Sequence, residues 1–213
     1  MMRLSLGIGA LVLALGYTLS APAPMRAMRT DFFPTKVGTK WQYGFPGSFG
    51  GFTHSISAIE RTNRGAIVSI VTNGGDARVG PPLLMKKILV SERGLELLHD
   101  HDYTGEVVDP PLAILKLPHK PGEAWERKEL PWVSLRYTAR ESEVIRVPAG
   151  SFKVVRIDRE IIAPTLDPKE YALAPEYYWY APGVGVVKCE YGDNRNVYWL
   201  TSFTTGNADM KNR

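Results

Sequence analysis

The sequence has a single cysteine, Cys189, among 213 residues. One cysteine cannot close an intramolecular disulfide, which excludes a disulfide scaffold and also a multi-cysteine zinc or iron–sulfur site. Long runs of one charge are missing as well: 26 Lys and Arg stand against 22 Asp and Glu, and acidic residues interrupt the basic ones at 126–129 and 158–160. Nucleic-acid binding needs a basic stripe, so we expect no nucleic-acid partner.

Catalytic motifs are also missing. Ser48 lies in a glycine-rich stretch, but Pro46 stands where the G-x-S-x-G motif requires a glycine. Cys189 lies in an apolar run, where a buried and inert thiol is the usual outcome. Because motifs for a nucleophile, a metal or a phosphate are absent, we favour a non-enzymatic protein with no catalytic residue and no cofactor.

Residues 1–20 have the pattern of a secretory signal peptide. Arg3 supplies the positive charge, residues 4–15 form an uncharged apolar run, and Thr18 and Ser20 are the small residues that precede cleavage. The apolar run is shorter than the roughly 20 residues that a membrane-spanning helix needs. We therefore expect cleavage after Ser20, no transmembrane span in the mature chain, and a secreted or periplasmic location.

The rest of the chain is typical of β-structure. Short runs of Val, Ile, Tyr, Phe and Trp alternate with period two and are separated by Gly, Pro and Asn, whereas no segment has a convincing helical period. Hairpin signals at 148–150 and 182–183 favour antiparallel pairing. We predict one all-β domain over 33–205 with little helix, after a linker at 21–32 and before a tail at 206–213. The predicted strands are 40–45, 52–61, 66–73, 83–91, 95–101, 134–147, 152–162, 176–180, 185–191 and 197–203.

An internal repeat is visible in the spacing. The pattern P-x-K-x-G-x-x-W begins at Pro34 and again at Pro118, and in each half a glycine that opens an apolar strand follows at a matching distance. We infer two similar halves, about residues 33–116 and 117–205. Two such units would form either a β-sandwich of two packed sheets or one sheet curled into a β-barrel.

Aromatic residues give the candidate ligand contacts. Trp41 and Trp125 end the repeated pattern, where a tryptophan is expected either to anchor the core or to stack on a ligand. In the run 177–180, alternation sends Tyr178 and Tyr180 to one face of a strand and the other two aromatics to the opposite face. One pair should enter the core, and the other should cover an outer face or line a cavity. We therefore take Tyr178, Tyr180, Trp41 and Trp125 as candidate ligand-binding residues.

Two histidines are the candidate metal ligands. His99 and His101 are two apart, so on a strand they share a face, as zinc or copper ligands could. A metal site would still need a third protein ligand and hydrogen-bond partners that orient the ligands. The sequence brings none near, and the neighbouring residues 103–105 are typical of a solvated loop.

Charged residues flank the predicted hairpin at 148–150. Its register places Arg140 opposite Asp158 and Arg156 diagonal to Glu141 and Glu143. Cross-strand ion pairs on a solvated face explain these residues better than a glycosidase acid pair does.

Three segments together resemble a known group. They are F-P-x-K-x-G-x-x-W-x-Y at 33–43, P-A-G-x-F at 148–152 and W-Y-A-P-G-V-G-x-V at 179–187. The chain resembles a widespread group of exported bacterial proteins that is similar to the TapB-like proteins and related domains of unknown function. The resemblance implies an antiparallel β-barrel or sandwich outside the cytoplasm, with no assigned reaction.

Three functions follow from these patterns. The first is a non-enzymatic binding or accessory module of the cell envelope, whose partner is an unknown envelope component or a small apolar ligand. The second is a carrier of an apolar ligand such as a lipid, which would need a continuous apolar cavity of several hundred Å3. The third is a hydrolase or metal-binding protein that uses His99 and His101, which would need further ligands converging on them.

Overall fold

The computed structural model describes most of the predicted β domain, over residues 32–74, 82–101, 106–130, 133–162, 175–192 and 196–206. The predicted signal peptide lies outside the described residues, as do the predicted linker up to residue 31 and the predicted tail from residue 207. Phe32, the last residue of the predicted linker, packs in the core and is 7% exposed. Within the described ranges, no helix has the length and apolar character needed to cross a membrane.

Twelve β-strands and no helix make up the described part of the chain, which confirms the prediction of an all-β, antiparallel fold. The strands are β1 (Lys40–Gly44), β2 (Gly51–Thr62), β3 (Gly65–Gly74), β4 (Leu83–Ser91), β5 (Gly94–Asp100), β6 (Glu106–Lys116), β7 (Ala124–Leu130), β8 (Val133–Val147), β9 (Gly150–Ile162), β10 (Glu176–Ala181), β11 (Gly185–Tyr191) and β12 (Asn196–Thr204).

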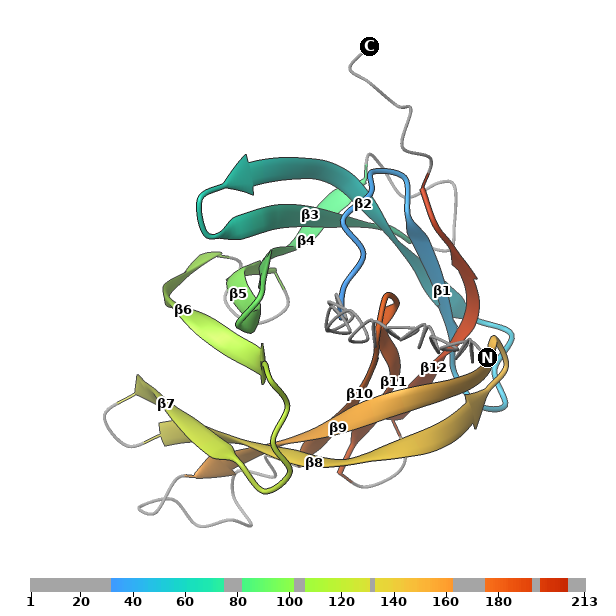
Figure 1. Ribbon diagram of the computed structural model, residues 1–213. Helices are drawn as coiled ribbons and strands as arrows, with labels where there is room; N and C mark the ends of the chain where they lie inside the picture. The colour runs from blue at the N-terminus through green and yellow to red at the C-terminus, as the bar shows by residue number, and fades with distance from the viewer. Residues whose placement is uncertain are drawn as a thin grey trace, which may run out of the picture.

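All twelve strands belong to one sheet with the order β6-β5-β4-β3-β2-β1-β12-β11-β10-β9-β8-β7. The first strand pairs with the second and with the last, so the two ends of the chain meet in the middle of the sheet order. Consecutive strands β6 and β7 form the two edges. Figure 1 shows the sheet curled into a nearly closed barrel in which these edges face each other. Of the two predicted architectures, the chain therefore adopts the barrel.

The barrel has two different ends, because the strands are antiparallel and most connections are hairpins. At one end, here called the turn end, lie the tight hairpins β2–β3, β4–β5, β8–β9 and β10–β11. At the other end, the loop end, residues 45–50 connect β1 to β2, and β4, β6, β10 and β12 begin there. The two ends also differ in the polarity of the interior residues that lie near them.

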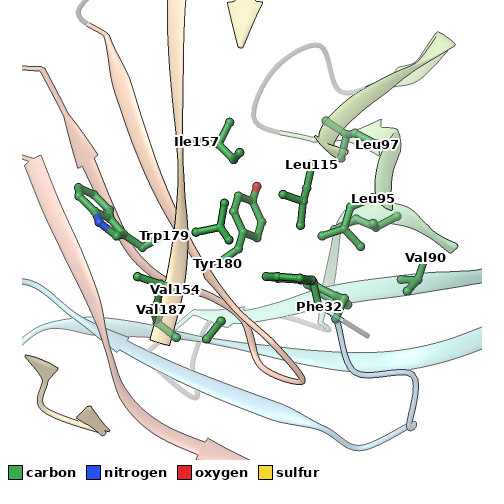
Figure 2. Packing of buried hydrophobic residues seen from close by; sticks show 14 of the residues in the cluster. Phe32, Val90, Leu95, Leu97, Leu115, Val154, Ile157, Trp179, Tyr180 and Val187 are labelled. Atoms are coloured by element: carbon green, nitrogen blue, oxygen red, sulfur yellow. The ribbon is translucent and has the colours of Figure 1, made fainter. Parts of the chain in front are cut away.

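The interior is filled from the turn end by the chain segment that precedes β1 (Figure 1, blue). The Phe33 ring lies 5.4 Å from the Trp41 ring. A Cβ at Gly185 would lie 2.9 Å from the Phe33 ring, so only a glycine leaves room for this phenylalanine. Figure 2 shows Phe32 turned into the same interior as Tyr180 and the leucines of β5 and β6. The barrel core is therefore closed at the turn end by aromatic packing.

The two segments that share the P-x-K-x-G-x-x-W pattern have closely matching backbone geometry. Gly38 and Gly122 both have a φ of 81°. The Gly38 N–H donates to the Ile56 carbonyl on β2 at 2.9 Å, and the Gly122 N–H donates to the Ala139 carbonyl on β8 at 2.8 Å. In each case a register shift in the partner strand follows directly. Each segment thus leads into the first of six consecutive antiparallel strands.

The β8–β9 hairpin differs by one residue from the predicted register. Val147 pairs with Gly150, and a bulge between Ala139 and Ser142 shifts the pairing once more. The predicted partner of Arg140 is nevertheless found, since its Nε lies 2.7 Å from an Asp158 oxygen. Glu143 pairs with Val154, so Arg156 lies diagonal to Glu143 as predicted, and it also forms an ion pair with Asp158 at 2.8 Å. The prediction of a solvated face fails for Asp158, which is only 3% exposed, whereas Arg140, Glu141 and Glu143 are exposed.

Candidate binding cavity

The barrel encloses a cavity of about 170 Å3. Side chains from all twelve strands and from the segment before β1 line it, including three of the predicted ligand contacts, Trp41, Tyr178 and Tyr180. An engineered cavity of about 150 Å3 in another protein takes up benzene. The cavity is therefore large enough for one molecule with a single ring.

The polarity of the lining changes along the barrel axis. On four strands, a charged lining residue lies closer to the loop end than an apolar lining residue of the same strand. These pairs are Lys86 and Ile88 on β4, Asp100 and Leu97 on β5, Asp109 and Leu112 on β6, and Arg159 and Ile157 on β9. The cavity is consequently amphipathic, with its apolar part toward the turn end.

The opening lies at the loop end, beside the start of β6. Val107 is 76% exposed and Asp109 is exposed, yet both line the cavity. Arg127, close to the end of β7, lines it too. A molecule entering here would pass charged side chains first and reach the aromatic and aliphatic ones afterwards.

Two ion pairs hold charged side chains at this polar part. Lys86 Nζ lies 3.1 Å from Asp100 Oδ2, with 30% and 10% of the two side chains exposed. Arg159 bonds Glu176, whose other carboxylate oxygen accepts a hydrogen bond from the Tyr178 hydroxyl. Removing charges from water is costly unless they are paired, and the pairs provide this compensation. They also fix the positions of the side chains that a ligand would meet.

Hydrogen bonds to the backbone fix the aromatic side chains of the wall. The Trp41 indole N–H donates to the Val184 carbonyl at 2.7 Å, and the Tyr43 hydroxyl donates to the Val186 carbonyl at 2.8 Å. The Tyr43 ring lies 5.2 Å from the Tyr198 ring in an edge-on contact. Both carbonyls belong to the turn and strand that follow β10, so these bonds tie β1 to β11 across the intervening strand β12.

Burial keeps the tyrosine hydroxyls and the His54 imidazole of the wall neutral. It raises the pKa of the Tyr43 and Tyr180 hydroxyls far above the ordinary value. Burial, and secondarily the positive charge of Lys86, lowers the pKa of His54 to about 4. Near neutral pH the cavity therefore presents phenolic hydroxyls and an uncharged imidazole, which can donate or accept hydrogen bonds.

The fourth predicted ligand contact, Trp125, lies outside this set. It stacks on Tyr137, with the two ring centroids 5.7 Å apart, and its indole N–H donates to the Ala113 carbonyl at 2.7 Å. Trp125 pairs directly with the cavity-lining Tyr137, so both side chains project from the same face of the sheet, but Trp125 itself does not line the cavity. Its visible role is to join β7 to β6.

The aromatic run of β10 divides between the two faces. Tyr178 and Tyr180 point into the cavity, whereas Trp179 lies across the strand from Tyr180 (Figure 2). The Trp179 indole donates to Glu143 at 2.8 Å, and Lys188 Nζ lies 4.6 Å from the ring centroid. Charged side chains thus cover this second face, so that Trp179 is only 5% exposed.

The candidate metal ligands His99 and His101 are not joined by further ligands from the described residues. His99 is half-buried on β5, opposite Lys87 and Val107, and His101 is exposed just after that strand. No group of three or more His, Cys, Asp or Glu side chains suited to a metal occurs in the described part of the chain. Metal binding at these two histidines stays a prediction.

Sequence reasoning missed the charged residues of the cavity. For Lys86 and Arg159 a signal exists: each shares its period-two face with apolar residues, Ile88 and Val90 in one case and Ile157 in the other. Asp100 carries no such signal, because a register shift between Leu97 and His99 changes the face to which it points.

Comparison with known proteins defines the class of the fold. No protein-family model matches the chain, and no curated protein matches it. Among solved structures, it is similar to a predicted exported protein with a YmcC-like fold from Bacteroides fragilis NCTC 9343, at 17% identity and a TM-score of 0.50, over 82% of this chain and 99% of that chain. It is also similar to a predicted lipoprotein from Parabacteroides distasonis ATCC 8503, at 17% identity and a TM-score of 0.47, over 81% and 98%. At this identity the likeness concerns the fold alone, and it gives no support to the TapB-like assignment.

Proposed function

We propose that this protein is an exported, non-enzymatic binding protein of the cell envelope that takes one small amphipathic molecule into its barrel. The signal-peptide pattern at 1–20 supports export. The export assignment of the Bacteroides fragilis protein with a similar fold supports it as well. The secreted and periplasmic locations are both compatible with this function.

The polarity gradient of the cavity is the observation that carries the proposal. A ligand with an apolar ring would lie against Trp41, Ile88 and Leu97, while its polar group would remain near Lys86 and Asp100. A cavity that served only as a packing defect would be apolar throughout, because unpaired charges are costly to bury. Here paired charges line one end, where they can exchange a hydrogen bond with an entering ligand.

Cavity size favours a ring-sized ligand over a lipid. Sites for drug-sized ligands occupy roughly 300–1,000 Å3, and an acyl chain needs a continuous apolar space of that order. The cavity of about 170 Å3 is smaller, and its lining is charged at one end. Carriage of a whole lipid chain inside the barrel is therefore the weaker of the two binding functions.

We also propose that the barrel consists of two related six-stranded units, about residues 33–116 and 117–205. The shared φ at Gly38 and Gly122 and the equivalent hydrogen bonds of these glycines support it. In such an arrangement the β12–β1 junction would be equivalent to the β6–β7 junction. Strand pairing closes the β12–β1 junction, whereas the β6–β7 junction has no strand pairing among the described residues and is open. The open junction lies beside the cavity opening, where Arg127 and Asp109 line it.

Native mass spectrometry of protein purified from its own envelope tests the binding function first, because a retained molecule adds its mass. Thermal denaturation with phenol, benzoate and benzylamine then tests the size class, since a ligand that binds only the folded state raises the melting temperature. We expect at least one probe to do so. The variant Ile88→Phe should abolish the shift by filling the cavity, whereas Val144→Phe, at a position 73% exposed on β8, should keep it. Absence of both an adduct and any shift would contradict the proposal.

A further inference from the structure

Exposed apolar side chains gather at the loop end of the barrel. The described residues expose five large hydrophobic side chains, and four of them lie at this end: Phe45, Phe49, Leu83 and Val107. Single exposed hydrophobic residues are ordinary on a soluble protein. A concentration at one end, with Phe49 fully exposed, marks an interaction surface instead. We call these four residues the apolar rim.

The β1–β2 loop is built to present its phenylalanine. The Ser48 N–H donates to the Phe45 carbonyl at 3.1 Å, and the Gly50 N–H donates to the Ser48 hydroxyl at 3.0 Å. Gly47 has a φ of 71°, which a glycine adopts without strain. No charged residue occurs between Phe45 and Phe52. The loop thus has its own internal hydrogen bonds, and Phe49 extends from it without covering any part of the barrel.

The apolar rim is continuous with the cavity opening. Val107 belongs to both, since it is 76% exposed and lines the cavity. On the other side, the Phe45 ring lies 6.0 Å from Phe52, which stacks 5.0 Å from the cavity-lining Tyr43. A partner bound to the rim would therefore lie directly at the entrance of the barrel.

We propose that the apolar rim docks the loop end of the barrel on a lipid bilayer, with Phe49 inserted at the interface. A protein partner would hold an aromatic anchor in a well-packed, desolvated pocket among other contact residues. Phe49 has no such packing. A bilayer requires no complementary shape, and an uncharged loop loses little hydration when it enters the interfacial region.

Docking in this orientation would place the cavity opening against the membrane surface. An amphipathic ligand could then pass between the lipid interface and the barrel without crossing water. The docking proposal goes beyond the binding function and does not depend on it, because vesicle binding can be measured without any ligand.

Co-sedimentation with vesicles tests the proposal directly. The processed protein is mixed with phosphatidylethanolamine and phosphatidylglycerol vesicles at 3:1, and the bound fraction is measured against lipid concentration for wild type, Phe49→Ser and Val144→Ser. All three carry the same N-terminus, so any contribution of residues 21–31 is common to them. We expect Phe49→Ser to partition about tenfold more weakly, as the loss of one buried phenylalanine predicts. Val144→Ser, altered at the opposite end, should bind as wild type does.

A second measurement reports on insertion. Relative to wild type, Phe49→Trp should add a tryptophan emission that shifts to the blue on vesicles and is quenched by brominated lipid, whereas Val144→Trp should show neither change. Since Phe49 is fully exposed, neither of its variants is expected to affect folding. If wild-type protein remains in the supernatant at every lipid concentration, the proposal is overturned and a protein partner becomes the better interpretation of the rim. Equal binding of wild type and Phe49→Ser overturns it as well.

Discussion

The indole N–H of Trp125 donates a hydrogen bond of 2.7 Å to the carbonyl of Ala113, across the junction where the two edge strands of the barrel face each other. β7 thereby holds β6 through a side chain instead of a backbone ladder. Lys116 Nζ lies 5.0 Å from the Trp125 ring centroid and 3.5 Å from a Glu123 oxygen, which adds a cation–π contact and an ion pair at the same place. The tryptophan of the second repeated pattern thus closes the barrel at its turn end.

Replacing this tryptophan should weaken the closure. Trp125→Phe keeps a ring to stack on Tyr137 but removes the donor to Ala113, so we expect a loss of about 1–2 kcal/mol in the free energy of unfolding. Urea denaturation measures this loss, and hydrogen exchange should show faster exchange in β6 than in β2. Trp41→Phe is the matched variant, since it also loses one indole bond to a carbonyl, at 2.7 Å, but within a paired strand. Accelerated β6 exchange in both variants would contradict a specific role of Trp125 at the junction.

The ion pair inside the cavity gives a second prediction. Lys86→Met removes one ion-pair partner of Asp100, whose side chain is only 10% exposed, and should cost about 2 kcal/mol in the free energy of unfolding. The double variant Lys86→Met/Asp100→Leu should be less destabilised than the sum of the single ones, because it removes the buried carboxylate together with the ammonium group that compensates it. A double-mutant cycle by chemical denaturation measures the difference. Strictly additive effects would show that the two side chains do not stabilise each other.

The pH dependence of stability should contain a contribution from His54. Its pKa is about 4 in the folded protein and 6.5 in the unfolded chain, so between these values the unfolded state binds the extra proton. The contribution is complete above pH 6.5 and is lost as the pH falls toward 4, with a total of about 3 kcal/mol at most.

The variant His54→Phe should remove this part of the pH dependence while keeping the ring contact with Phe52, whose centroid lies 4.9 Å away. Val144→Ser, at an exposed position without a titratable group, is the control and should leave the profile parallel to that of wild type. Denaturation curves between pH 4 and 7 provide the comparison. A His54→Phe profile parallel to that of wild type would show that another group is responsible.

How far the sequence predicts this molecule depends on the range of the interaction concerned. Alternation is local, so it placed Tyr178 and Tyr180 on one face of their strand, and both do line the cavity. Turn chemistry is local too, and the β8–β9 hairpin forms at the predicted residues. Neither signal contains the pairing of β1 with β12, which joins residues more than 150 positions apart, such as Trp41 and Phe203.

The cavity charges were missed for a related reason. A bulge adds one residue to a strand and reverses the faces of every residue beyond it. Such shifts occur between Ile70 and Val71 and between Leu97 and His99, close to the Lys86–Asp100 pair. Their positions depend on how the sheet curves, and barrel curvature is a property of the whole closed sheet. Asp100, whose face depends on such a shift, was therefore the least predictable of the cavity charges from local pattern.

Close approach of the backbone makes Gly94 the most demanding glycine of the sheet. Its φ is 126°, and a Cβ there would lie 1.9 Å from the carbonyl oxygen of Leu115 on β6. Gly94→Ala must therefore either separate β5 from β6 or strain the turn, and we expect a loss of about 3 kcal/mol in the free energy of unfolding. Gly47→Ala is the matched control, since its φ of 71° is also unfavourable but nothing lies within 4 Å. It should cost about 1 kcal/mol, the conformational term alone. Equal losses for the two variants in urea denaturation would show that the contact with β6 contributes nothing, and that backbone conformation accounts for both.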